Sequence, residues 1–137
     1  MRSLRQPLPL LLAWAIGAIG FGIVGCTPHI GDSCKLSTDC SVTGDRLCDT
    51  SMPDGYCTIF ACESDHCPSS SSCLEFHPDS DRFSRRFCAS QCSSDSDCRP
   101  GYVCVAQVDT AGVDPARTRD FIVYDKGPQS HYTYCLP

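Results

Sequence analysis

The chain contains few of the residues that normally build an apolar core. From Cys26 to Pro137, leucine, isoleucine, valine and phenylalanine number 18, about 16% of the 112 residues in that stretch. A fraction below roughly 20% is typical of chains that remain disordered unless another constraint acts on them. No segment of the same stretch has helical periodicity beyond one turn. These absences exclude a fold stabilised mainly by apolar burial or by long helices.

The usual catalytic and metal-binding motifs are missing as well. There is no G-x-S-x-G elbow, no C-x-x-C-H haem site and no EF-hand loop. The histidines His66, His77 and His131 occur singly in loops. Paired aspartates are more often turn caps than calcium ligands, and only the intervals around Cys62 and Cys88 are as short as zinc sites require. We therefore expect no enzyme, no metal site and no cofactor.

Basic residues are also scarce. Nine basic residues and sixteen acidic residues follow position 25, which gives this part a net charge of −7. An acidic surface repels the phosphates of nucleic acids and the head groups of anionic lipids. The composition therefore argues against a nucleic-acid partner.

Cysteine is the residue that the chain has in excess, with thirteen copies. Twelve of them fall into three sets of four, and an aromatic residue precedes the last cysteine of each set (Tyr56, Phe87 and Tyr134). We expect one cysteine-rich module per set, over residues 34–57, 62–88 and 92–135, the last with a long loop at 109–120. The sets are Cys34, Cys40, Cys48 and Cys57; Cys62, Cys67, Cys73 and Cys88; and Cys92, Cys98, Cys104 and Cys135.

The twelve cysteines are predicted to form disulfides. At about 11% of the residues after the leader, they lie in the range of disulfide scaffolds, and each bond across about 15 residues contributes roughly 3 kcal/mol. Four cysteines allow three pairings. We predict pairing within each set, first with third and second with fourth, because interleaved bonds make a compact pair of hairpins. The predicted fold is small, disulfide-rich and irregular, with short β-hairpins and little or no helix.

Short β-strands are predicted where aromatic or β-branched residues lie between turn residues. Residues 69–72, four serines, read as a polar loop, and the turns before Cys40 and Cys98 look alike because Asp39 and Asp97 occupy the same place in them. The predicted strands cover 55–58, 83–89, 102–108, 120–125 and 132–136.

The first 25 residues have the layout of a secretory signal peptide. Arg2 and Arg5 form a positive start, residues 8–24 are uncharged and apolar, and Gly25 precedes Cys26. The alternative is an uncleaved transmembrane anchor, since residues 8–25 are 18 long and just able to span a bilayer. The glycines in the run, and a cysteine at its end, favour the signal peptide.

The block Ile23-Val24-Gly25-Cys26 resembles the bacterial lipobox. The resemblance implies cleavage before Cys26, a diacylglycerol on its thiol and further acylation of the new amino terminus. Two or more acyl chains would anchor the protein stably in a membrane. Residues 26–33 would then be the lipidated cysteine and a short tether. Thr27, in place of an inner-membrane-retaining aspartate, implies the outer membrane of the cell envelope.

The cysteine-rich part resembles small extracellular repeats, such as the Dickkopf-type cysteine-rich region and the repeats of many myxobacterial lipoproteins. The shared pattern is C-x5-(D)C-x5-7-C…(Y/F)C, found mainly in the first and third sets, and the long interval from Val105 to Tyr134 departs from it. The resemblance implies an extracellular setting and carries no functional residue to this chain.

We expect a non-enzymatic, membrane-anchored envelope lipoprotein whose stapled modules bind an extracellular protein or play a structural role. Aromatic residues beside the long loop (Phe121, Tyr124, Tyr132 and Tyr134) suggest a binding surface, although packing against disulfides in the core is the favoured interpretation. The alternative function is a protease inhibitor whose loop exposes Arg117 or Arg119, or another extracellular ligand-binding protein.

Overall fold

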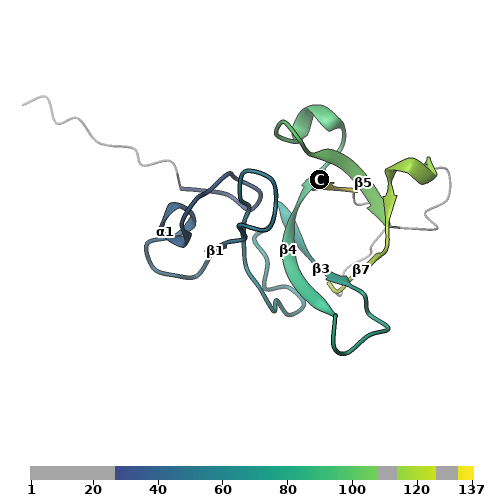
Figure 1. The fold of residues 1–137 in the computed structure, drawn as a ribbon, viewed down its shortest axis with the longest axis horizontal. Helices are drawn as coiled ribbons and strands as arrows, with labels where there is room; N and C mark the ends of the chain where they lie inside the picture. Colours follow the sequence, from purple (N-terminus) through teal and green to yellow (C-terminus); the bar gives the residue numbers. More distant parts are fainter. Residues whose placement is uncertain (1–26, 108–113, 126–132) are drawn as a thin grey trace, which may run out of the picture.

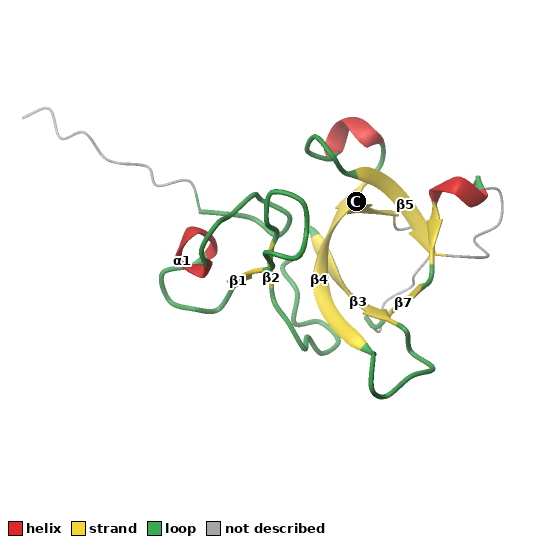
Figure 2. Cartoon of the chain, in the orientation of Figure 1, coloured by secondary structure: helices red, strands yellow, loops and turns green. Residues whose placement is uncertain are grey.

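The computed structural model describes residues 27–107, 114–125 and 133–137. It confirms a small disulfide-rich fold of short strands and irregular loops, with one α-helix in this part of the chain (Figures 1 and 2). The elements are α1 (Ser37–Cys40), β1 (Leu47–Cys48), β2 (Cys57–Thr58), β3 (Ser71–Phe76), β4 (Arg85–Cys92), the 3₁₀ turn η1 (Asp95–Asp97), β5 (Val103–Gln107), the 3₁₀ turn η2 (Pro115–Arg117), β6 (Thr118–Arg119), β7 (Phe121–Val123) and β8 (Thr133–Leu136).

The strands form a two-stranded sheet and a six-stranded sheet. β1 and β2 pair antiparallel, and the larger sheet has the order β6-β5-β8-β4-β3-β7, antiparallel except between β5 and β6. Its two outermost strands, β6 and β7, are separated along the chain by Asp120 alone. The sheet is therefore curled, and Figure 1 shows β4, β3, β7 and β5 arranged in a ring.

The predicted strands are found with shifted ends, and one loop prediction is wrong. Residues 69–72 were expected to be a polar loop, but Ser71 and Ser72 begin β3 and are buried. Their hydroxyls are satisfied there, because Ser71 donates to the Pro68 carbonyl and Ser72 accepts from the Gln91 amide. In the predicted loop 109–120, residues 115–119 contribute η2 and β6, while 109–113 lie outside the described residues.

All twelve cysteines of the three sets are disulfide-bonded in the predicted pattern. Within each set the first cysteine pairs with the third and the second with the fourth, and these six bonds stay inside their sets. The pairs are Cys34–Cys48, Cys40–Cys57, Cys62–Cys73, Cys67–Cys88, Cys92–Cys104 and Cys98–Cys135.

The second and third sets are nevertheless joined by one continuous strand. β4 carries Cys88 of the second set and Cys92 of the third, and it pairs with β3 on one side and with β8 on the other. The two sets therefore share the six-stranded sheet. The first set forms its own small lobe around β1, β2 and α1 (Figure 2).

The core is split between disulfides and aromatic rings. Around the curled sheet, the buried cluster contains Leu74, Phe87, Ala89, Val105, Phe121, Tyr134 and Leu136. The aromatic residues that precede the fourth cysteines, Tyr56, Phe87 and Tyr134, are all buried. These rings supply the apolar area that the scarce aliphatic residues do not.

Two stacked tyrosines attach the first set to the rest of the molecule. Tyr56 lies against Tyr102 with ring centroids 5.6 Å apart. The Tyr102 hydroxyl donates to the Pro53 carbonyl at 2.9 Å, and the Tyr56 hydroxyl accepts from the Ser90 amide at 2.9 Å. Burial raises the pKa of Tyr56 to about 12. The six disulfides all stay within their sets, so contacts such as this one hold the lobe against the sheet.

Candidate functional site

An apolar groove lies where the first lobe, the turn between β3 and β4 and the end of the chain meet. Its volume is about 730 Å³ and it is open to solvent along one side. Apolar and aromatic side chains make up most of its wall, with charged groups between them. The lining residues are Asp49, Ser51, Met52, Phe60, Phe76, His77, Ser80, Phe83, Arg85, Phe87, Arg119, Leu136 and Pro137.

The floor of the groove is built by strand ends. Phe76, the last residue of β3, stacks on Phe87 of β4 with centroids 5.2 Å apart and planes 5° from parallel. Leu136, the last residue of β8, is buried beside them. Phe76 pairs with Arg85 across the hairpin, and Phe87 lies two residues further along β4. Residues two apart on a strand point to the same face, so Phe76 and Phe87 lie on one face of the sheet.

The sides of the groove are two exposed phenylalanines. The exposed fraction is 40% for Phe60 and 64% for Phe83. Phe60 is held by a β-bridge to Phe87, and Phe83 lies on the β3–β4 turn, where its amide donates to the Ser80 carbonyl at 2.9 Å. Large apolar side chains with this exposure, next to an apolar floor, are a feature of interaction sites.

Positive charge predominates at the rim of this groove. Arg85 is exposed, and within the described part of the chain it has no ion pair or hydrogen bond through its side chain. Arg119 donates to the Ala116 carbonyl at 3.3 Å and to the Pro137 carbonyl at 3.5 Å. The lining acid, Asp49, accepts from the Ser51 amide at 3.0 Å and so caps its own turn. The rim therefore differs in sign from the acidic chain as a whole.

The predicted aromatic binding surface is only partly present. Phe121 and Tyr134 are buried in the core, as the favoured interpretation required, and Tyr132 lies outside the described residues. Tyr124 is 38% exposed, and the Arg86 guanidinium lies 4.7 Å from its ring centroid. Sequence reasoning missed Phe60 and Phe83. The alternation of arginine and phenylalanine over residues 82–87 was the available signal, because both residue types are enriched at interfaces.

One of the two arginines suggested for protease inhibition, Arg117, is engaged in an ion pair. Arg117 binds Asp95 through two hydrogen bonds of 2.6 and 2.7 Å. Asp95 also accepts from the Cys104 amide at 2.9 Å, and the Arg117 and Cys104 bonds together lower the pKa of Asp95 to about 2. The guanidinium of Arg117 is therefore occupied within the chain, which leaves it poorly placed to enter a protease cleft.

Asp39 and Asp97 serve as turn caps. Asp39 accepts from the amides of Lys35 and Leu36 at 2.8 and 2.9 Å. Asp97 accepts from the amides three and four residues before it, at 2.9 and 2.8 Å. These backbone bonds lower the pKa of both carboxyls. The two turns are therefore capped in the same way, as their sequences suggested, although one is α-helical and the other is 3₁₀.

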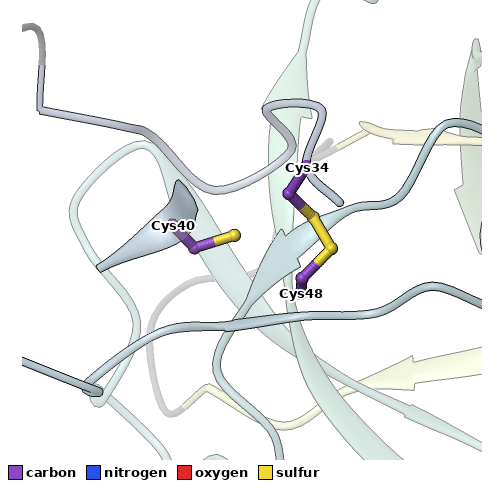
Figure 3. A group of neighbouring side chains, drawn as sticks. All are labelled: Cys34, Cys40 and Cys48. Carbon is purple, nitrogen blue, oxygen red and sulfur yellow. A yellow bond between two sulfur atoms is a disulfide. The ribbon is translucent and has the colours of Figure 1, made fainter. Parts of the chain in front are cut away.

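The cysteine sulfurs lie close together, in a way that resembles a metal site only superficially. In each set three sulfurs fall within 4.8 Å of one another, for example those of Cys34, Cys40 and Cys48 (Figure 3). Cys34 and Cys48 are bonded to each other, and Cys40 is bonded to Cys57. A disulfide sulfur lacks the thiolate charge that binds metals. The clusters are crossing points of two disulfides.

The predicted leader and lipidation site lie outside the described residues, since the structure describes nothing before Thr27. His66 and His77 are exposed on separate turns, and His131 also lies outside the described part. Within residues 27–107, 114–125 and 133–137, no helix has the length and apolar character needed to cross a bilayer.

Comparison with known proteins gives no relative for this chain. No protein-family model matches it, and neither curated proteins nor solved structures yield a significant match.

Proposed function

We propose that this protein is a non-enzymatic lipoprotein of the bacterial cell envelope, anchored through Cys26 and presenting a disulfide-stapled body to an extracellular protein. One observation carries the proposal. The six disulfides use all twelve cysteines from Cys34 to Cys135, so Cys26 alone has no place in the stapled body. A cysteine at the end of an apolar leader, outside a complete set of bonds, suits a lipid attachment point.

The disulfides themselves support export. Such bonds form and persist in oxidising compartments and are rare in the cytoplasm of mesophiles. A body with so little aliphatic core depends on them, because small domains rarely gain enough stability from burial alone. We therefore propose that the protein folds after translocation. The outer membrane is proposed because Thr27 stands in place of an inner-membrane-retaining aspartate.

The body would lie close to the bilayer. Residues 26–33 were expected to form a tether, but Ile30 is buried and the Gly31 amide donates to the Cys57 carbonyl at 2.9 Å. The Arg46 guanidinium also contacts the Pro28 carbonyl. Only about three residues then separate Cys26 from the packed body, a reach of roughly 10 Å. The proposed anchor would hold the lobe of the first set against the membrane.

The three cysteine sets are proposed to be copies of one repeat. Their disulfides share one pattern, and Asp39 and Asp97 cap equivalent turns in the first and third sets. A covalently fixed body of this kind presents surface loops at low entropic cost. The apolar groove is the part of the described surface best suited to a binding role.

Mass spectrometry of the mature amino terminus tests the proposal. The full chain is expressed in a bacterium that processes lipoproteins, and the membrane fraction is digested and analysed. We expect the first peptide to begin at Cys26 and to carry the added mass of a diacylglycerol. A Cys26→Ser variant provides the control, and it should lose both the lipid and the membrane association. A mature chain beginning at another residue, or an unmodified Cys26, would refute the anchor.

A further inference from the structure

We propose that the apolar groove receives an apolar side chain of a protein partner, at a position where the partner also carries a carboxylate. This inference rests on the proposed binding role and specifies the chemistry of the partner. The groove residues Met52, Phe60 and Phe83 supply the apolar contact, and Arg85 supplies the charge.

The composition of the groove favours a protein partner. Aromatic residues, methionine and arginine are the residues enriched in protein–protein interfaces. Here four phenylalanines, one methionine and two arginines line a single hollow. Small-molecule sites usually enclose most of the ligand surface, whereas this groove is open along one side and Phe83 projects with 64% of its surface exposed. An inserted side chain with flanking contacts fits this shape.

The floor of the groove is rigid enough to act as a preformed pocket. The ring centroid of Phe87 lies 5.2 Å from that of Phe76 and 6.4 Å from that of Tyr56, and the Phe76 centroid lies 5.5 Å from that of Phe121. The residue after Phe87 on the strand, Cys88, is fixed by the disulfide to Cys67. An interface anchored in a preformed pocket loses less conformational entropy on binding.

Charge complementarity predicts a negative charge on the partner. The part of the chain after the leader carries −7, yet the groove is lined by Arg85 and Arg119 against one acid, Asp49. Asp79 and Asp81 belong to the same β3–β4 turn but do not line the groove. Because Arg85 has no ion pair in the described structure, a carboxylate from outside would gain a charge-assisted contact without breaking an existing one.

A labelled peptide tests this proposal. The probe is a fluorescein-labelled hexapeptide with phenylalanine and leucine between two pairs of aspartates, and binding is followed by fluorescence anisotropy on the full processed chain in nanodiscs. One comparison peptide replaces the aspartates by lysines, and a second replaces the two apolar residues by alanines. We expect saturable binding of the first peptide and at least about tenfold weaker binding of both others.

Two variants assign the binding to the groove. Phe83→Ser and Arg85→Glu are each expected to weaken binding of the acidic peptide about tenfold. Val42→Ser and Lys35→Glu are the matched controls, because Val42 is 92% exposed, Lys35 is exposed and neither lines the groove. All four positions lie at the surface, so the variants should fold, and their disulfide mass and circular dichroism verify this.

Several outcomes would overturn the proposal. They are no binding of the acidic peptide, equal binding of the lysine peptide, or equal binding by the Phe83 and Arg85 variants. Decanoate that competes at the concentration of the peptide would replace the protein partner by a small amphiphile. These results are read from peptide binding, whereas the anchor is read from the mass of the amino-terminal peptide, so a failure of binding leaves the mass-spectrometric test of Cys26 unaffected.

Discussion

The guanidinium carbon of Arg99 lies 4.0 Å from the centroid of the Tyr102 ring. From this position Arg99 also reaches across to the first cysteine set, where its Nη2 donates to the Pro53 carbonyl at 2.9 Å and contacts the Gly55 carbonyl. The Tyr56 ring of the first set lies 5.9 Å from the same guanidinium. One arginine therefore joins two parts of the molecule whose disulfides all stay within their own sets.

Replacing Arg99 by alanine should loosen the first lobe without changing any disulfide. The variant loses charged hydrogen bonds to carbonyls and a cation–π contact, which together are worth about 2 kcal/mol. We expect a fall of that size in the free energy of unfolding, measured by urea denaturation of the oxidised protein. Arg82→Ala is the control, because Arg82 also makes a cation–π contact, 5.8 Å from the Phe83 ring centroid, but that ring is exposed. It should change stability by less than about 0.5 kcal/mol, and equal effects of the two would contradict the prediction.

Gly55→Ala should prevent correct formation of the first set. Gly55 has a φ of +69°, and a Cβ added there would lie 2.0 Å from the Cys34 carbonyl oxygen and 2.9 Å from its sulfur. Neither atom can move away, because Cys34 is bonded to Cys48. We expect free or mispaired thiols in the first set, detected by alkylation and disulfide mapping.

Gly44→Ala measures the cost of backbone strain without a steric collision, and so serves as the comparison for Gly55→Ala. Gly44 also has a positive φ, +82°, but nothing lies within 4 Å of an added Cβ. The substitution should cost about 1–2 kcal/mol from the left-handed conformation alone and leave the disulfide map unchanged. A native disulfide map in both variants would contradict the prediction, because it would show that the first set forms correctly without the close approach of Gly55 to Cys34.

The cysteine framework could be predicted from sequence because its constraints are local. Each set brings its own four cysteines within a short stretch, and aspartates before Cys40 and Cys98 marked the same turn in two of them. Strands with alternating aromatic or β-branched residues, such as β5 and β8, were found for the same reason. Hydrogen bonds within a few residues leave a pattern that one chain can reveal.

The groove and β3 depended on contacts between distant residues. Ser71 and Ser72 look like loop residues, and they are strand residues only because β4 pairs with them and Gln91 donates to the Ser72 hydroxyl. Phe60 and Phe83 are 23 positions apart and meet in one groove only after the β3–β4 hairpin forms. Sequence periodicity does not report such long-range pairing, so these features needed the structure.

Asp95 and Arg117 should make stability fall in acid. The pKa of Asp95 is lowered from 3.8 to about 2, first by the hydrogen bonds from Arg117 and then by the Cys104 amide. Because the folded state has the lower pKa, the unfolded chain binds the proton first as the pH drops. The contribution of this pair is therefore fully present above about pH 5 and is lost progressively as the pH falls towards 2.

Thermal unfolding of Asp95→Asn against the wild-type protein tests this relationship. Asparagine does not titrate, so the variant should unfold at a lower temperature near neutral pH and show a shallower fall in Tm between about pH 4 and pH 2. Arg117→Gln should give the same flattening, because it removes the main cause of the lowered pKa. Both members of the pair are about half exposed, with side-chain exposures of 49% and 43%, so added salt should reduce the difference between wild type and variant. Parallel Tm curves for all three proteins would mean that the pair does not contribute to stability in solution.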